Sequence, residues 1–190
     1  METTDTEKRE VLLMLQEGAD ALEVALKDID DLAAQRKPSP ESWSVLECIE
    51  HLTLTETGLL SRLRDAKPGE ESHEDRARER KFRDLALDRA CRIEAPPQVV
   101  PPGESNTVAH ALDNFTKARC ETVRFVEEFR GQLHMWLTLH PLITRPVNCY
   151  EMLLLMAMHP HRHAMQIAQI RQWLRDGKGS TVTRSSSPLE

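Results

Sequence analysis

The chain of 190 residues has few aromatic residues, few glycines and no long apolar segment. Aromatic residues make up 4% of the sequence and there are 7 glycines, whereas leucine, alanine, glutamate and arginine are abundant. This composition favours helices over sheets. No apolar run approaches the roughly 20 residues that cross a bilayer, and the N-terminus lacks a charged-then-apolar leader. We therefore expect no membrane partner and a cytoplasmic location.

Concentrated positive charge is also missing. The formal net charge is -6, and the basic stretch from Arg76 to Arg83 is interleaved with acidic residues, so we interpret it as a solvated helix face. Because binding to phosphate backbones needs clustered lysine or arginine, no nucleic-acid partner is expected.

Paired cysteines are absent as well. The four cysteines are scattered along the chain, at Cys48, Cys91, Cys120 and Cys149. Without a CxxC pair, neither a zinc ribbon nor a redox motif is indicated. Buried free thiols are the interpretation that we prefer.

Apolar residues recur at steps of three and four in several long segments, and this spacing predicts amphipathic helices. The predicted helices cover about residues 12–33, 44–67, 107–130 and 148–175, with a shorter, charged helix over 74–92. Capping boxes formed by Ser44 with Glu47 and by Asn148 with Glu151 mark the start of the second and the last long helix. Gly131 is placed to end the third.

A proline-rich connector over residues 96–103 cannot be helical, and it is long enough to cross an end of a helical bundle. Four long helices with one long crossover predict an all-α protein with a four-helix bundle fold. We expect one domain over residues 1–176. The serine-rich residues 177–190 are expected to form a flexible tail.

Two histidines near the C-terminus, His159 and His163, stand four residues apart on one face of the last predicted helix, which is a metal-ligand spacing. Together with Gln166 they interrupt an apolar stripe, where each unsatisfied polar group would cost on the order of 1 to 3 kcal/mol. His51, on the second predicted helix, could complete a three-histidine site with one coordination position open to water. The competing interpretation is that these histidines are exposed, or are buried in the core and hydrogen-bonded, without a metal.

Other polar residues could support such a site. Arg119 interrupts the apolar stripe of its helix, so it either forms a buried ion pair with a glutamate or binds an anionic group of a substrate. Glu47 either supports His51 from one turn away or only caps its helix. Gln166 would orient a ligand or the substrate. His140 and Glu47 are the candidates for a fourth protein ligand.

The order and spacing of several segments resemble the DinB-like superfamily, which includes bacillithiol transferases. These segments are Trp43 to Leu52, Ala95 to Pro97, Phe115 with Arg119, His140 with Pro141, Glu151, and His159 to Ile167. The resemblance covers about residues 10–175. It implies a four-helix bundle of unusual connectivity, commonly a homodimer, in which three histidines hold a divalent metal such as zinc or nickel. Here these would be His51, His159 and His163.

The sequence departs from the family pattern in two places. Pro160 falls inside the last helix, where it removes the amide hydrogen bond to Met156, so we expect a kink that disturbs the geometry of His159 and His163. The loop after His140 and Pro141 lacks the glycine that is usual there.

Family members with known activities transfer low-molecular-weight thiols or isomerise thiol-linked substrates, and many members have no established activity, so the resemblance leaves open whether this chain is an enzyme. We expect a divalent-metal-dependent enzyme of the thiol S-transferase or hydrolase type, acting on a small molecule and using a low-molecular-weight thiol. The alternative is a non-catalytic, stress-related binding or scaffold protein with a structural metal or none. An enzymatic site would be open to thiols, whereas a structural site would be closed by a fourth protein ligand.

Overall fold

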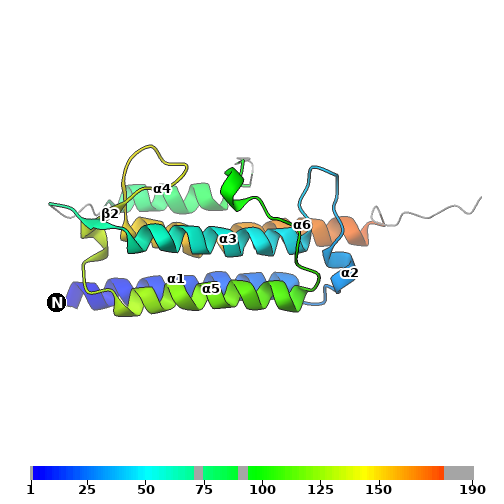
Figure 1. The fold of residues 1–190 in the computed structure, drawn as a ribbon, viewed down its shortest axis with the longest axis horizontal. Coiled ribbons are helices and arrows are strands. Elements are labelled where there is room, and N and C mark those ends of the chain that lie inside the picture. Colours follow the sequence, from blue (N-terminus) through cyan, green and yellow to red (C-terminus); the bar gives the residue numbers. More distant parts are fainter. Residues whose placement is uncertain (1, 71–74, 90–93, 178–190) are drawn as a thin grey trace, which may run out of the picture.

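Four long helices build the fold of the computed structural model, which describes residues 2–70, 75–89 and 94–177. They are α1 (Glu2–Leu26), α3 (Val45–Arg64), α5 (Val108–Glu128) and α6 (Cys149–Arg175). Helices α1 and α5 form one layer, and α3 and α6 form the other (Figure 1). The predicted four-helix bundle is confirmed. Residues 178–190 of the predicted tail, and Cys91, lie outside the described residues.

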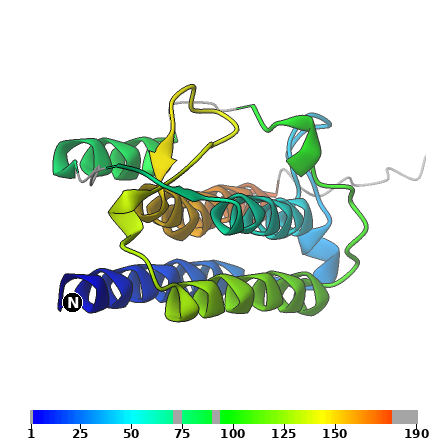
Figure 2. The same ribbon diagram turned by 60° about the vertical axis from the view of Figure 1, so that its left-hand side comes forward.

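The direction of the helices explains the long crossover. Helices α3 and α5 run the same way, whereas α1 and α6 run the opposite way, in both views of the bundle (Figures 1 and 2). The chain must therefore travel back along the bundle between α3 and α5. This crossover contains α4 (Arg76–Leu87), which packs against α6, and the 3-10 turn η1 (Pro97–Val99), which packs against α3. No helix in the described part of the chain is both long enough and apolar enough to span a membrane.

The first predicted helix is wrong at its C-terminal end, because α1 stops at Leu26 and a short helix α2 (Asp31–Ala34) follows. Asp28 has a φ of 62°, a left-handed conformation that ends the helix. Asp30 then starts α2, since its carboxylate accepts the amide of Ala33 at 2.8 Å. The apolar periodicity continues across this break, so it could not reveal it.

Both predicted capping boxes are confirmed. In α3 the side chain of Ser44 accepts from the amide of Glu47, and the Glu47 carboxylate accepts from the amide of Ser44. Asn148 and Glu151 do the same in α6. Gly131 is not the cap of α5, whose last turn is followed by extended backbone at Phe129. The sequence therefore predicted the starts of these helices more accurately than their ends.

A small antiparallel sheet at one end of the bundle was not predicted. It contains β1 (Lys67–Pro68), β2 (Trp136–Thr138) and β3 (Val147–Asn148), in the order β1-β2-β3, and the 3-10 turn η2 (Leu133–Met135) precedes β2. Strands of two or three residues are too short to show an alternating pattern. The sheet ties the loop after α3 to the loop before α6.

The buried apolar residues form two clusters, one toward each end of the bundle. The first contains Leu15, Leu63 and Leu153, and the second contains Leu22 and Phe115. Along α6 the first cluster ends at Met158 and the second resumes at Ala164. The segment between them, which carries the candidate ligands, therefore lies in a polar layer across the bundle.

The cysteine prediction is correct in part. Cys48 and Cys149 are buried free thiols, whereas Cys120 is exposed because it lies on the outer face of α5.

Candidate metal centre

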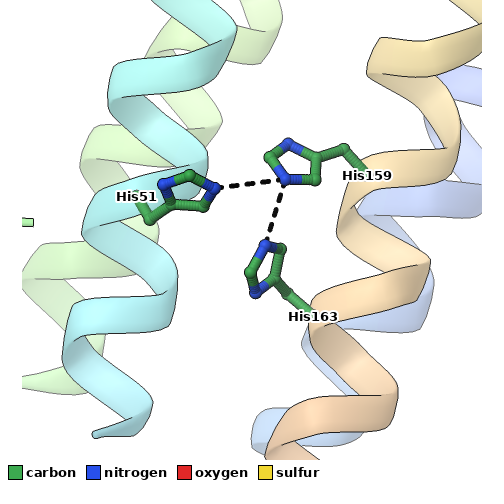
Figure 3. Close-up of side chains that lie close together, drawn as sticks. All are labelled: His51, His159 and His163. Carbon is green, nitrogen blue, oxygen red and sulfur yellow. Dashed lines mark hydrogen bonds between the residues drawn. The ribbon is translucent and has the colours of Figure 1, made fainter. Parts of the chain in front are cut away.

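The three predicted histidine ligands lie side by side between α3 and α6 (Figure 3). The Nε2 atom of His159 is 3.2 Å from Nε2 of His51 and 3.0 Å from Nε2 of His163. One ligand atom from each of the three residues lies within 4.8 Å of the others. The helical spacing of four places His159 and His163 on successive turns of α6, and His51 faces them from α3.

This arrangement fits a divalent metal. Four-coordinate zinc with bonds of about 2.05 Å to nitrogen holds its ligand atoms about 3.3 Å apart, close to the separations of 3.2 Å and 3.0 Å between the Nε2 atoms. Among the residues that the structure describes, no fourth histidine, cysteine or carboxylate joins the cluster. The donor set is therefore three histidines, the ligand number that catalytic zinc sites commonly use.

A backbone carbonyl from the crossover orients His51. The Nδ1 atom of His51 lies 2.7 Å from the carbonyl oxygen of Val99, in η1, and donates a hydrogen bond to it. Its Nε2 is then the unprotonated nitrogen, and this is the atom that faces the other histidines. Trp43 packs over the ring of His51 with 4.6 Å between centroids, and over His163 at 6.1 Å.

The environment favours neutral imidazoles. Burial lowers the pKa of both His159 and His163 well below the ordinary value, and the nearby histidines and the guanidinium of Arg162 lower it further. Burial also lowers the pKa of His51, partly offset by its bond to Val99. Because a metal binds only the unprotonated nitrogen, this environment prepares all three side chains for coordination near neutral pH.

Glu47 does not support His51, in contrast to one of the two predicted roles. Its carboxylate accepts from the backbone of Ser44 and pairs with Lys37 at 2.6 Å, so the capping role is the one that the structure contains. The support for His51 comes from Val99 instead. This contact could not be predicted from residue types, because every residue has a backbone carbonyl. The proline-rich connector indicated only that a non-helical segment would cross the bundle.

His140 and Gln166 lie outside the ligand cluster. The Nδ1 atom of His140 accepts from the amide of Leu142 at 3.1 Å, so His140 is engaged with its own loop. Gln166 accepts from Arg89 at 3.2 Å. Its role toward a substrate stays a prediction.

Arg119 forms the buried ion pair that was one of its two predicted roles. Its Nε lies 2.9 Å from the Glu56 carboxylate, and its Nη atoms donate to the carbonyl oxygens of Leu15 at 2.9 Å and Met156 at 3.1 Å. The residue is 5% exposed. Arg119 thus pairs its charge with Glu56 of α3 and donates to backbone carbonyls of α1 and α6, so the ion-pair role is the one that the structure contains.

Pro160 does not interrupt α6, which is continuous from Cys149 to Arg175, and the Nε2 atoms of His159 and His163 lie 3.0 Å apart. Proline removes the amide that would bond to the Met156 carbonyl, and Arg119 donates to that carbonyl instead. Gly18 lets α1 approach α6 closely at Ala157, the residue after Met156, because a Cβ added at Gly18 would collide with the carbonyl oxygen of Ala157. The neighbouring helices thus accommodate the proline, and His159 and His163 keep their ligand spacing.

Comparisons with known proteins agree with this fold. YfiT from Bacillus subtilis, described as a probable metal-dependent hydrolase with an unusual four-helix bundle topology, superposes with a TM-score of 0.57 at 14% identity, over 90% of this chain and 87% of that one. A conserved protein from Enterococcus faecalis superposes with a TM-score of 0.60 at 14% identity, over 88% of this chain and 96% of that one. No curated protein matches the sequence. The family model of the DinB superfamily matches residues 14–167, and the chain therefore belongs to the DinB superfamily.

Proposed function

We propose that this protein is a divalent-metal-dependent enzyme in which His51, His159 and His163 hold a zinc or nickel ion and leave a position for a nucleophile. The observation that carries the proposal is the cluster of three buried or partly buried imidazoles from two helices, with no fourth ligand among the described residues. The description of YfiT as a probable metal-dependent hydrolase supports the same class of chemistry for this fold.

The protein's own residues would bind and orient. The Val99 carbonyl holds His51 in the tautomer that presents Nε2, and Trp43 covers two of the three rings against water. When bound, the metal would supply a Lewis acid that lowers the pKa of a thiol or of water toward neutrality.

The composition of the cluster favours a thiol over water as the nucleophile. Among the described residues, no carboxylate joins His51, His159 and His163. Activation of water commonly uses a general base such as a carboxylate. A thiol, with an ordinary pKa of about 8.5, needs much less assistance. We therefore propose S-transfer from a low-molecular-weight thiol to a small molecule, with hydrolysis as the alternative.

Cobalt substitution tests the proposal. Protein purified without chelator or affinity nickel is loaded with Co²⁺, beside His159→Ala and the matched control His161→Ala, which removes a neighbouring histidine outside the cluster. We expect near-stoichiometric cobalt in the wild type and the control, and loss in His159→Ala. Added 2-mercaptoethanol should produce a sulfur-to-cobalt charge-transfer band in the wild type.

The other outcomes separate the alternatives. Equal loss of cobalt in His161→Ala, or full retention in His159→Ala, would refute the three-histidine assignment. Bound cobalt with a spectrum that thiols leave unchanged would indicate a closed, structural site. No metal in any sample would favour the non-catalytic scaffold. The single domain over residues 1–176, the homodimer and the cytoplasmic location remain predictions from the sequence.

A further inference from the structure

A hollow lies on the opposite face of α6 from the histidines. It has a volume of about 320 Å³ and lies between α1, α4 and α6, and its lining includes Glu10, Arg76, Glu79, Arg80, Arg83 and Tyr150. Tyr150 and His159 are nine positions apart on α6, which at about 100° per residue turns them about 180° away from each other. The hollow is therefore separate from the candidate metal centre.

Three arginines of α4 rim this hollow. Arg76, Arg80 and Arg83 follow the helical spacing of four and three, so they lie on one face. Arg80 makes no hydrogen bond or ion pair with any residue that the structure describes, and Arg83 donates only to the sulfur of Met14, at 3.4 Å. The sequence predicted a solvated helix face for this stretch. The hollow could not be predicted, because helical periodicity does not show which other elements lie opposite the arginines.

The acidic groups of the hollow are already engaged. The Glu79 carboxylate pairs with Arg76 at 3.3 Å and with His134 at 3.0 Å. Tyr150 is hydrogen-bonded to Glu10, and burial raises its pKa to about 12, so its hydroxyl keeps its proton. Three arginines and two glutamates line the hollow, so its formal charge is +1 in a chain of net charge -6. Arg80 and Arg83 are the arginines of this lining that do not pair with Glu79.

We propose that this hollow binds a small molecule that carries a phosphate or carboxylate group, with Arg80 and Arg83 as its anion-binding residues. A guanidinium binds such oxyanions through two parallel N–H donors. The volume of about 320 Å³ lies at the lower end of the roughly 300–1,000 Å³ of small-molecule sites. That volume suits a small metabolite and exceeds the needs of a bare ion.

The single tyrosine of the chain makes the hollow directly observable. Because Tyr150 is the only tyrosine, labelling with ring-¹³C tyrosine gives the NMR signals of a single ring, located in this hollow and away from the metal centre. The full chain is titrated with glycerol 3-phosphate and with succinate at constant ionic strength, and with glycerol as the uncharged control. We expect a saturable shift of the Tyr150 signal with at least one of the two anions and none with glycerol.

Matched variants assign the binding. Arg80→Gln and Arg83→Gln should each weaken the affinity roughly tenfold, since each removes a charge-assisted hydrogen-bond donor. Lys81→Gln removes the same charge from the exposed side of α4 and should change the affinity less than about twofold. Arg80 is exposed and forms no hydrogen bond or ion pair with the described residues, so its variant should fold normally. No saturable shift with either anion, an unchanged affinity in Arg80→Gln, or an equal loss in Lys81→Gln would overturn the proposal.

Discussion

At the scale of single residues, Arg119 connects three helices of the core, because it pairs with Glu56 of α3 and donates to carbonyls of α1 and α6. Its loss should therefore lower stability. Truncation to alanine would leave the Glu56 carboxylate buried without its cationic partner, with the Thr122 hydroxyl still beside it, and the Met156 carbonyl without the Arg119 donor. Removing one partner of a buried ion pair commonly costs about 3–5 kcal/mol. We expect Arg119→Ala to lower the free energy of unfolding by about that amount, measured by urea denaturation.

The double variant Arg119→Met with Glu56→Leu is the control for this prediction. It replaces both charges by apolar groups of similar size, and such replacements are often close to neutral. We expect it to be more stable than Arg119→Ala, even though the Met156 carbonyl loses its donor. A loss below about 1 kcal/mol in Arg119→Ala would contradict the structural role of the ion pair.

Sequence reasoning at this scale succeeded where a residue type is out of place. The histidines on a core-facing stripe, and an arginine in the middle of another, could be recognised because burying them without partners would be unfavourable. The partners could not be identified. Glu56 lies on a different helix from Arg119, and Val99 contributes a carbonyl that every residue has. Their identity depends on how the helices pack, which local periodicity does not specify.

At the scale of elements, two helical glycines should respond oppositely to alanine. Gly18 lies where α1 contacts α6, and an added Cβ would collide with the backbone carbonyl of Ala157. Gly58 lies on the exposed side of α3, where an added Cβ meets nothing within 4 Å. We expect Gly18→Ala to destabilise by about 1–3 kcal/mol and Gly58→Ala to stabilise by about 0.5–1 kcal/mol. Urea unfolding midpoints test both, and the same sign for the two variants would contradict the close contact of α1 with α6.

The elements that could be predicted are those whose signals lie in adjacent residues. Capping boxes and apolar periodicity gave the starts of α3 and α6 because these interactions close within one turn. The break after Leu26 depends on the left-handed Asp28, and the three-stranded sheet depends on pairing between residues as distant as Lys67 and Leu137. Both are decided by the rest of the fold.

At the scale of the whole molecule, the polar layer makes stability depend on pH. Burial lowers the pKa of His51, His159 and His163, and it lowers that of His140 to about 4. In the unfolded chain these histidines titrate near pH 6.5. Below that pH the unfolded state binds protons that the metal-free folded state excludes, so acid favours unfolding.

The metal-free protein should therefore lose stability steadily as the pH falls from about 7.5 to about 5.5, a range in which most exposed carboxylates remain ionised. Urea midpoints measured in chelator test this. The double variant His159→Gln with His163→Gln should lose less stability over this range, because it lacks two of the imidazoles that bind protons only in the unfolded state. His110→Gln, which removes an exposed histidine from α5, should behave as the wild type does. A wild-type midpoint that is constant over this range, or an equal loss of stability in the double variant, would contradict the prediction. Either result would mean that the buried imidazoles accept protons in the folded state. Such imidazoles would be poorly prepared to hold a metal near neutral pH.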